Sequence, residues 1–231
     1  MTEEGLLVYN KSKGILSGVD ALRIKAETAS QNIRIGIQEV FSHSIAGEMA
    51  SCFEGSVELF ELDSGEMERH LLEKKIDFGF TFVPFPQKEI EYLKITKVSF
   101  ASFYKRGAFK NTKTEEVPYV IPSSELLDNP LSFKFRDGWN KDLSRFSPFK
   151  ANSLSAGLGM VQAGVAAIYI PKFLAKSMNA SLITSQQLVE VQMPPDRQAA
   201  EITWRDIFLA KTGKETREMK KATRVIRLNS N

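Results

Sequence analysis

Cysteine and histidine are scarce in this chain: its 231 residues include one cysteine, Cys52, and two histidines, His43 and His70. A single cysteine excludes a disulfide within the chain, and its place in an apolar helical pattern favours a packed thiol. Neither histidine stands in a metal-ligand spacing or beside residues that mark a nucleophile. We therefore expect no enzymatic activity, no cofactor, no metal, and a reducing compartment such as the cytoplasm.

The sequence also lacks a large excess of charge of either sign and lacks long hydrophobic runs. The 31 Lys and Arg residues nearly balance 28 Asp and Glu residues, for a net charge of +3. These charges are scattered, so no part of the chain resembles a nucleic-acid-binding surface. No apolar run reaches the roughly 20 residues that span a bilayer, and the N-terminus lacks the order of a signal peptide. The sequence predicts a soluble, intracellular protein with no membrane partner.

The first thirty residues differ in pattern from the rest. Two interleaved series recur every seven residues, namely Val8, Ile15 and Leu22, and Ser12, Val19 and Ala26. Such a pattern is typical of a long helix that pairs with another helix, although Gly14 and Gly18 weaken it. The alternative is an amphipathic helix that packs on its own domain.

From Asn32 onward, strands alternate with helices. Strands are expected at residues 32–37, 57–60 and 77–82, with a helix after each of the first two. The string Asp63-Ser64-Gly65-Glu66 is interpreted as a capping box, and Met67, Leu71 and Leu72 as the buried face of the second helix. Two consecutive strand-helix-strand steps predict a largely parallel sheet covered by helices, because parallel strands need crossover connections.

The second half of the chain repeats this alternation less regularly. Strands are expected at residues 98–104, 119–121, 164–171, 188–191 and 207–210, and helices from residue 153, at 172–177 and at 214–227. A second sheet follows from this pattern, and the fold class is α/β.

Five short strings, in matching order and spacing, resemble the LysR-type transcription regulators over nearly the whole chain. They are Met1-Thr2-Glu3-Glu4-Gly5, Asn32-Ile33-Arg34-Ile35-Gly36, Leu72 to Phe80, Asn152-Ser153-Leu154, and Val161 to Pro171. The first is similar to the string that closes the winged helix-turn-helix of that family and begins its linker helix. Ala166 and Lys75 depart from the family pattern, which commonly has glycine at both places.

The resemblance implies two Rossmann-like lobes of the periplasmic-binding-protein type II fold, joined by two crossover strands and preceded by a long linker helix. Residues 1–30 would form the linker or dimerisation helix, residues 31–100 and 210–231 regulatory lobe I, and residues 101–209 regulatory lobe II. The helix-turn-helix itself would be missing, which suggests a fragment.

The function implied by the resemblance is that of an effector-sensing domain. A small-molecule effector would bind between the lobes, and the change would reach the absent DNA-binding domain through the packing of a homo-oligomer. The oligomer would be a dimer, or a tetramer when full length, and DNA would be contacted only through the missing N-terminal domain. The alternative is a solute-binding protein of the same fold that serves transport, which would need export.

Ligands of open α/β sheets lie beyond the carboxyl ends of the strands, so residues that follow strands are the candidates for the site. The resemblance also maps family effector contacts onto Gln38, Val40 and their neighbours. The expected ligand-binding residues are Gln38, Glu39, Val40, Phe41, Thr81, Phe82, Ser123, Ser124, Asn152, Ser153 and Ala166.

Some of these residues have a structural alternative. The hydroxyl groups and Asn152 could instead cap helices or turns. The carboxylate of Glu39 either faces the cleft, where it would favour a cationic or hydroxyl-rich ligand, or points to solvent. Arg136 is expected in an exposed loop rather than in the cleft.

Overall fold

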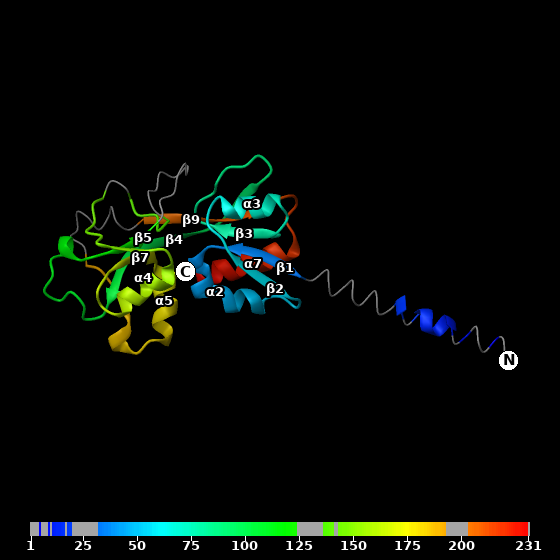
Figure 1. The fold of residues 1–231 in the computed structure, drawn as a ribbon, viewed down its shortest axis with the longest axis horizontal. Coiled ribbons are helices and arrows are strands. Elements are labelled where there is room, and N and C mark those ends of the chain that lie inside the picture. Colours follow the sequence, from blue (N-terminus) through cyan, green and yellow to red (C-terminus); the bar gives the residue numbers. More distant parts are fainter. Residues whose placement is uncertain are drawn as a thin grey trace.

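Two long antiparallel strands, β4 (Glu91–Lys105) and β9 (Thr203–Lys211), run through the molecule and connect its two lobes (Figure 1). The computed structural model describes residues 32–123, 136–140, 143–192 and 203–230, together with residues 5, 9, 11–16, 18 and 19. The pairing of β4 with β9 shifts register between Lys94 and Thr96. Such a bulge increases the local twist of the ribbon, and here it falls between the two lobes.

Lobe I contains the parallel part of the sheet. Strand β1 (Ile33–Ile37) pairs in parallel with β2 (Val57–Glu61) and with β3 (Phe78–Thr81), and β3 pairs antiparallel with β9. The prediction of a largely parallel sheet is therefore wrong beyond the first three strands. The sheet is mixed, because the chain enters and leaves lobe I through the antiparallel crossover strands.

Three helices cover the two faces of the lobe I sheet. Helix α3 (Glu66–Leu72) lies on one face, and α2 (Glu39–Ser51) and α7 (Arg217–Asn229) lie on the other (Figure 1). Helix α3 begins after Gly65, whose N–H donates a hydrogen bond to the Glu68 carboxylate. The capping interaction therefore joins Gly65 and Glu68, and not the residues Asp63 to Glu66 where it was expected. Leu72, expected on the buried face, is exposed.

Lobe II is built around the second half of β4. Strands β7 (Ile168–Pro171) and β8 (Leu188–Glu190) pair antiparallel with it, and β5 (Val120–Pro122) pairs in parallel with β6 (Phe149–Ala151). A bridge between Tyr119 and Ala167 joins these two groups of strands. Two short 3₁₀ helices, Thr114–Glu116 and Thr184–Gln186, complete the connections.

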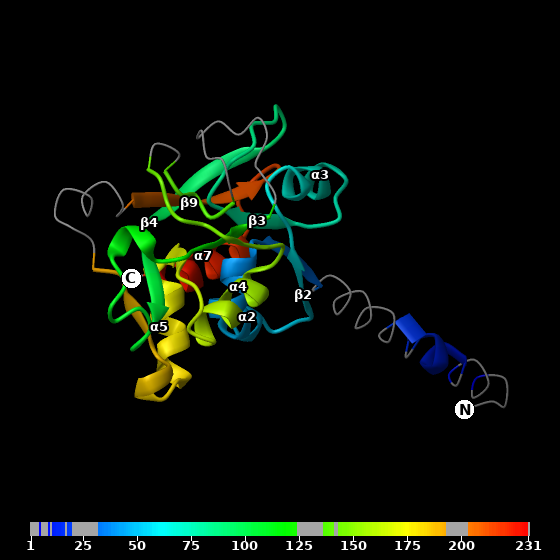
Figure 2. The ribbon, with the colours of Figure 1, turned by 60° about the vertical axis from the view of Figure 1, so that its left-hand side comes forward.

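The helices of lobe II are α4 (Leu154–Gln162) and α5 (Lys172–Ser181). Helix α4 lies beside α2 of lobe I in two views of the molecule (Figures 1 and 2). The lobes meet through the packing of α2 on α5 and through contacts of α2 with the start of α4, as well as through the crossover strands. This arrangement confirms the α/β fold of two lobes that the sequence predicts.

The N-terminal helix is described only in part. Residues 11–16 are helical, and Ile15 and Val19 are exposed. The remaining apolar heptad positions, Val8, Leu22 and Ala26, lie outside the described residues. Pairing of this helix with another one stays a prediction.

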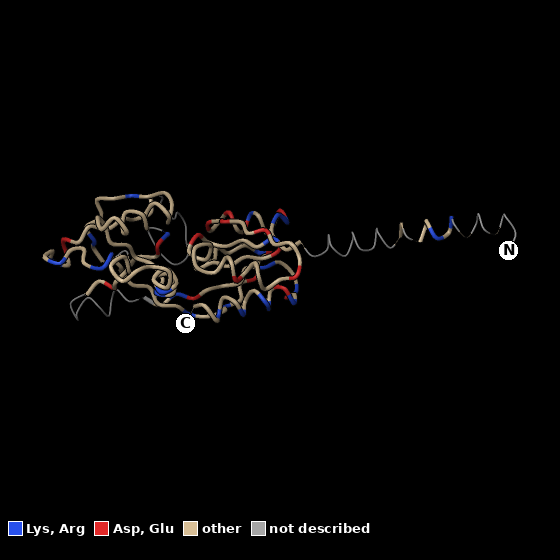
Figure 3. Tube along the Cα trace, turned by 90° about the horizontal axis from the view of Figure 1, so that it is seen from below, with Lys and Arg blue, Asp and Glu red and all other residues tan. Residues whose placement is uncertain are grey.

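Charged residues of both signs occur along the chain in both lobes (Figure 3). Within the described part of the chain, no helix combines the length and the apolar character that crossing a membrane requires.

Candidate ligand-binding cleft

A cleft of about 110 Å³ lies between the lobes. Lobe I contributes the residues that follow β1, β2 and β3, and lobe II contributes the start of α4 and parts of β5 and β7. Among the residues that line it are Gln38, Glu39, Val40, Asp63, Phe82, Phe100, Ile121, Arg136, Asp137, Ser153, Leu154, Tyr169 and Arg205.

Glu39 crosses the cleft to the N-terminus of α4. Its Oε1 accepts hydrogen bonds from the backbone N–H of Leu154 at 2.6 Å and of Ser155 at 3.3 Å. Glu39 is itself the first residue of α2. One carboxylate therefore lies between two helix N-termini, each of which carries partial positive charge.

A second contact joins α2 to α4. His43 Nδ1 lies 3.1 Å from the carbonyl oxygen of Glu39, and His43 Nε2 lies 2.9 Å from Ser155 Oγ. A carbonyl oxygen only accepts, so Nδ1 donates to it, and in the neutral imidazole Nε2 then accepts from the Ser155 hydroxyl.

Arg136 forms the third bridge between the lobes. Its Nη1 donates to Asp63 Oδ2 of lobe I at 2.6 Å, and its Nη2 donates to the carbonyl oxygen of Asn152 in lobe II at 2.8 Å. The side chain is 24% exposed. The expectation that Arg136 lies in an exposed loop is therefore wrong, because its guanidinium group finds a carboxylate on the other lobe.

A buried ion pair lies behind the lobe II wall. Arg145 Nη2 is 2.7 Å from Asp137 Oδ2, with both side chains less than one-tenth exposed. Burial raises the pKa of Asp137, and the charge of Arg145 opposes this effect. The Arg145 guanidinium also stacks 4.6 Å from the centre of the Trp139 ring, which helps to hold the pair in place.

Arg205 reaches the same wall from the crossover strand β9. Its Nη2 donates to the carbonyl oxygen of Gly138 at 2.6 Å. Burial lowers the pKa of Arg205, but an arginine remains protonated under all ordinary conditions.

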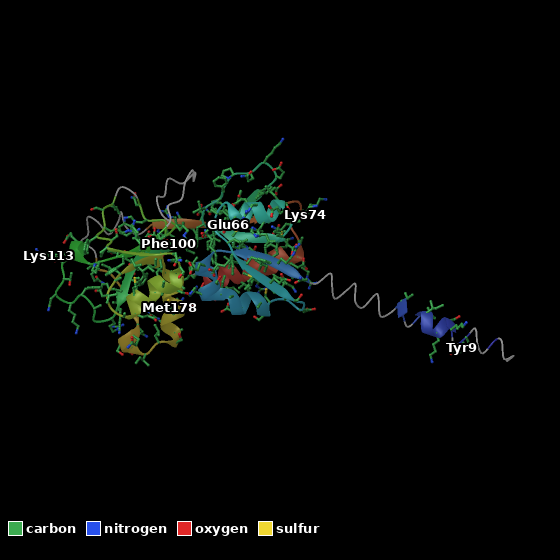
Figure 4. All side chains as sticks on the ribbon, in the orientation of Figure 1. Tyr9, Glu66, Lys74, Phe100, Lys113 and Met178 are labelled. Atoms are coloured by element: carbon green, nitrogen blue, oxygen red, sulfur yellow. The ribbon has the colours of Figure 1, made fainter. Side chains whose placement is uncertain are left out.

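A row of aromatic rings crosses from one lobe to the other beneath these polar groups. The ring centres of Phe41 and Phe82 are 5.0 Å apart, those of Phe82 and Phe100 are 5.2 Å apart, and those of Phe100 and Tyr169 are 5.6 Å apart. Phe100 lies on β4, on the lobe II side of the junction (Figure 4). Phe82, Phe100 and Tyr169 line the cleft, so its base is apolar.

The structure brings five of the predicted ligand-binding residues together in the cleft. These residues are Gln38, Glu39, Val40, Phe82 and Ser153. Ser153 is also the N-cap of α4, because its hydroxyl accepts from the N–H of Ala156. The Oε1 of Gln38 accepts from the N–H of Phe82 at 2.9 Å, which ties the end of β1 to the end of β3.

Other predicted residues lie away from the cleft lining. Phe41, Thr81 and Ala166 are fully buried, with the Thr81 hydroxyl bonded to the backbone of Val83. Ser123 and Asn152 are exposed beside the cleft, and Asn152 contributes its carbonyl to Arg136. Ser124 lies outside the described residues. Ligand contact by any of these residues stays a prediction.

The lining residues that were not predicted include the polar side chains of Asp63, Asp137, Tyr169 and Arg205. Asp63 follows β2 by two residues, so the strand-end argument that selected Gln38 could have selected it too. Arg205 lies on an antiparallel crossover strand, where that argument does not apply. Within the ranges that the structure describes, no group of three or more metal-ligating side chains is present.

No protein-family model matches the sequence, and no curated protein matches it either. Solved structures do match. CbnR, a LysR family transcriptional regulator, aligns with a TM-score of 0.65 and 12% identity over 98% of this chain and 81% of CbnR. A full-length mutant of BenM aligns with a TM-score of 0.60 and 18% identity over 99% of this chain and 78% of BenM.

An isolated regulatory domain also matches. A sulfate-bound mutant regulatory domain of OxyR2 from Vibrio vulnificus aligns with a TM-score of 0.58 and 16% identity, over 86% of this chain and 95% of that domain. At such low identity the likeness shows the fold alone. The chain has the two-lobed, periplasmic-binding type II fold found in the effector-binding domains of LysR-type regulators.

Proposed function

We propose that this chain is the effector-sensing domain of a LysR-type transcription regulator. It binds a small molecule in the cleft between its lobes and passes the resulting change to DNA-binding modules through oligomer packing. Binding rather than catalysis is its task, and it acts in the cytoplasm, where the DNA is. The ordered family-like strings in the sequence and the likeness of the fold to such regulators support this proposal.

The observation that carries the proposal is the construction of the cleft rim. Glu39, His43 and Asp63 of lobe I each contact a lobe II group, and the contacts of Glu39 and Asp63 border the cleft. A ligand in the cleft contacts both lobes beside these bridges, and so it binds the open and closed states with different affinity. A difference of this kind is what a ligand needs in order to shift a conformational equilibrium.

The output of the domain is the relative position of its lobes. Because β1 follows the N-terminal segment along the chain, a movement of lobe I would be passed on to that segment. In an oligomer, the packing of lobes and helices would then differ between the free and bound states. A homodimer, or a tetramer with its DNA-binding modules, is the assembly that we propose.

A thermal-shift screen of metabolites tests the cleft as the binding site. A ligand that binds only the folded state raises the melting temperature as its concentration exceeds Kd. Val40→Trp, which places a large side chain in the cleft, should weaken binding of an identified ligand at least tenfold. Val165→Trp makes the same change at an exposed position that does not line the cleft, and it should leave Kd unchanged.

Equal binding by the wild type and Val40→Trp would contradict the proposal. Circular dichroism should show that Val40→Trp is folded, and Val40→Phe provides a smaller cleft-filling change in case it is not.

A further inference from the structure

The N–H groups at the start of α4 are all used within the chain. Glu39 accepts hydrogen bonds from the N–H of Leu154 and of Ser155. The Ser153 hydroxyl accepts from the N–H of Ala156 at 3.2 Å, and the Ser153 carbonyl accepts from the N–H of Gly157. A helix N-terminus that faces a cleft is a ready site for an anion. Here that site already holds a carboxylate, which belongs to the opposite lobe.

The position of Glu39 also explains why the two lobes can close without a ligand charge between them. Helices α2 and α4 point their N-termini toward each other across the cleft, because the first residue of α2 bonds the first residue of α4. Two positive helix ends repel unless a negative group lies between them. Glu39 supplies that negative group from within the chain.

The other charged side chains of the cleft lining also have partners. Asp63 pairs with Arg136, Asp137 pairs with Arg145, and Arg205 bonds the carbonyl of Gly138. A charged ligand would have to displace one of these contacts and leave its partner without compensation in a partly buried site. Such a loss is costly, since a buried group left unpaired keeps its full desolvation penalty.

The part of the cleft that is not engaged in these contacts is apolar and largely aromatic. Phe82, Phe100 and Tyr169 form its base, and Val40 and Ile121 lie in its walls. Apolar cavities of about 150 Å³ hold one benzene molecule, so the cleft volume of about 110 Å³ is near the size of a single ring.

We infer that Glu39 is an intramolecular occupant of the α4 anion site and determines specificity: it excludes anionic effectors and leaves a cleft for an uncharged, mainly apolar, ring-sized molecule. This inference rests on the proposed function, because it assigns a ligand class to the same cleft. It replaces the idea that Glu39 recruits a cationic ligand, since the Oε1 of Glu39 is engaged by the lobe II backbone.

Three probes of nearly equal size and different charge test the inference at pH 7: benzyl alcohol, benzoate and benzylammonium. Kd is measured for each by NMR titration of the full chain. The wild type should bind benzyl alcohol at least tenfold more tightly than either ion. The largest amide shifts should come from Val40, Phe82 and Phe100.

Glu39→Ala should reverse the discrimination between benzyl alcohol and benzoate. Once the amides of Leu154 and Ser155 are free, benzoate affinity should rise at least tenfold, and benzoate should move those two amide signals back toward their wild-type positions. Glu39→Gln keeps an oxygen acceptor of the same length and serves as a second, less disruptive variant. Its affinity for benzoate should be higher than that of the wild type but lower than that of Glu39→Ala. Glu89→Ala, at an exposed lobe I position outside the cleft lining, is the matched control and should behave as the wild type.

The outcomes separate this inference from the proposed function. One outcome overturns the inference while the cleft stands as the binding site. In that outcome the wild type binds benzoate as tightly as benzyl alcohol, Val40→Trp no longer binds benzoate, and Glu39→Ala binds benzoate with the wild-type affinity. Preferential binding of benzylammonium would overturn it in the same way. Probe binding that shifts only residues outside the cleft, and that Val40→Trp does not affect, would overturn both.

Discussion

The buried carboxylate of Glu68 organises the loop that follows β3. It is 1% exposed, and it accepts hydrogen bonds from the N–H of Gly65 at 2.6 Å and of Phe85 at 3.2 Å. The hydroxyl oxygen of Tyr92 lies 2.7 Å from the same carboxylate. A buried charge is stable only with such a complete set of donors. One residue of α3 therefore holds the start of its own helix, the loop and the first part of β4 together.

Tyr92→Phe tests this cluster and its pH dependence. Burial, followed by the Glu68 carboxylate, raises the pKa of Tyr92 above its ordinary value of 10.0. Above about pH 10 the unfolded chain therefore loses a proton that the folded protein still holds, and wild-type stability falls as the pH rises. The variant should be less stable at pH 7 by about 1.5–3 kcal/mol, the usual contribution of a hydrogen bond to a charged group.

Urea unfolding from pH 7 to 11 measures both effects. The stability difference between the wild type and Tyr92→Phe should shrink above pH 10, because only the wild type loses the stabilising contribution of that proton. Tyr104→Phe, which changes a part-buried tyrosine on the same strand, should leave the alkaline decline due to Tyr92 in place. A constant difference at all pH values would contradict the role given to Tyr92.

Close packing between α3 and the lobe I sheet depends on small residues in the strands. A Cβ atom added at Gly79 of β3 would lie 2.6 Å from Met67 Sδ and 3.1 Å from the carbonyl oxygen of Gly36. Met67 is fully buried and cannot move into solvent. The glycine thus allows the helix to approach the sheet closely, which a larger side chain would prevent.

Gly79→Ala should destabilise the protein by about 1–3 kcal/mol, as expected for overpacking of a buried site. Gly159→Ala provides the matched control, because Gly159 is an exposed position of α4 where an added Cβ meets nothing within 4 Å. That change should stabilise the protein by about 0.5–1 kcal/mol through higher helix propensity. Chemical denaturation of the two variants measures the difference, and equal effects would contradict the packing argument.

The pattern of the sequence predicts most elements but not their full lengths. The three lobe I strands and helices α2, α4 and α7 are found where they were expected. The first half of β4 was missed, because its exposed Lys94 and Lys97 hide the alternation that marks a half-buried strand. β6 was missed because three residues are too few to show a period. The strand expected at 164–171 begins only at Ile168, after a turn in which Gly164 has a φ of +78°.

At the scale of the whole molecule, the lobes meet through the crossover strands, through the packing of α2 on α5, and through the contacts of Glu39, His43 and Arg136 across the cleft. The contact of Arg136 with Asp63 is partly exposed on both sides, with side-chain exposures of 24% and 42%. An ion pair of this exposure contributes about 0.5–1 kcal/mol. Its loss should shift the equilibrium between closed and open lobes without unfolding either lobe.

Arg136→Met tests this role. Loss of about 0.5–1 kcal/mol from the ion pair should raise the ratio of open to closed molecules roughly two- to fivefold at room temperature. Spin labels on cysteines introduced at Glu54 of lobe I and Lys113 of lobe II, in a Cys52→Ser background, report the distance between the lobes. Lys113 lies at the far end of lobe II (Figure 4), so a small rotation gives a large change.

The control for this measurement removes an ion pair confined to one element. Arg69 pairs with Glu66 within α3, at 3.6 Å, and does not line the cleft. Arg69→Met should leave the distance distribution unchanged. If Arg136→Met leaves it unchanged as well, the ion pair does not control closure. The aromatic row, the packing of α2 on α5 and the contacts of α2 with α4 then hold the lobes.

By itself, the sequence determined the alternation of strands and helices, the α/β class of fold, and the strand ends at which Gln38, Glu39 and Val40 lie. These features follow from periodic burial and turn chemistry over short stretches of chain. Only the tertiary structure decided that Glu39 bonds the start of α4, 115 residues away, and that Arg136 pairs with Asp63. The physical reason is that the twist and register of the crossover strands set which groups meet across the cleft, and no local pattern of residues records that geometry.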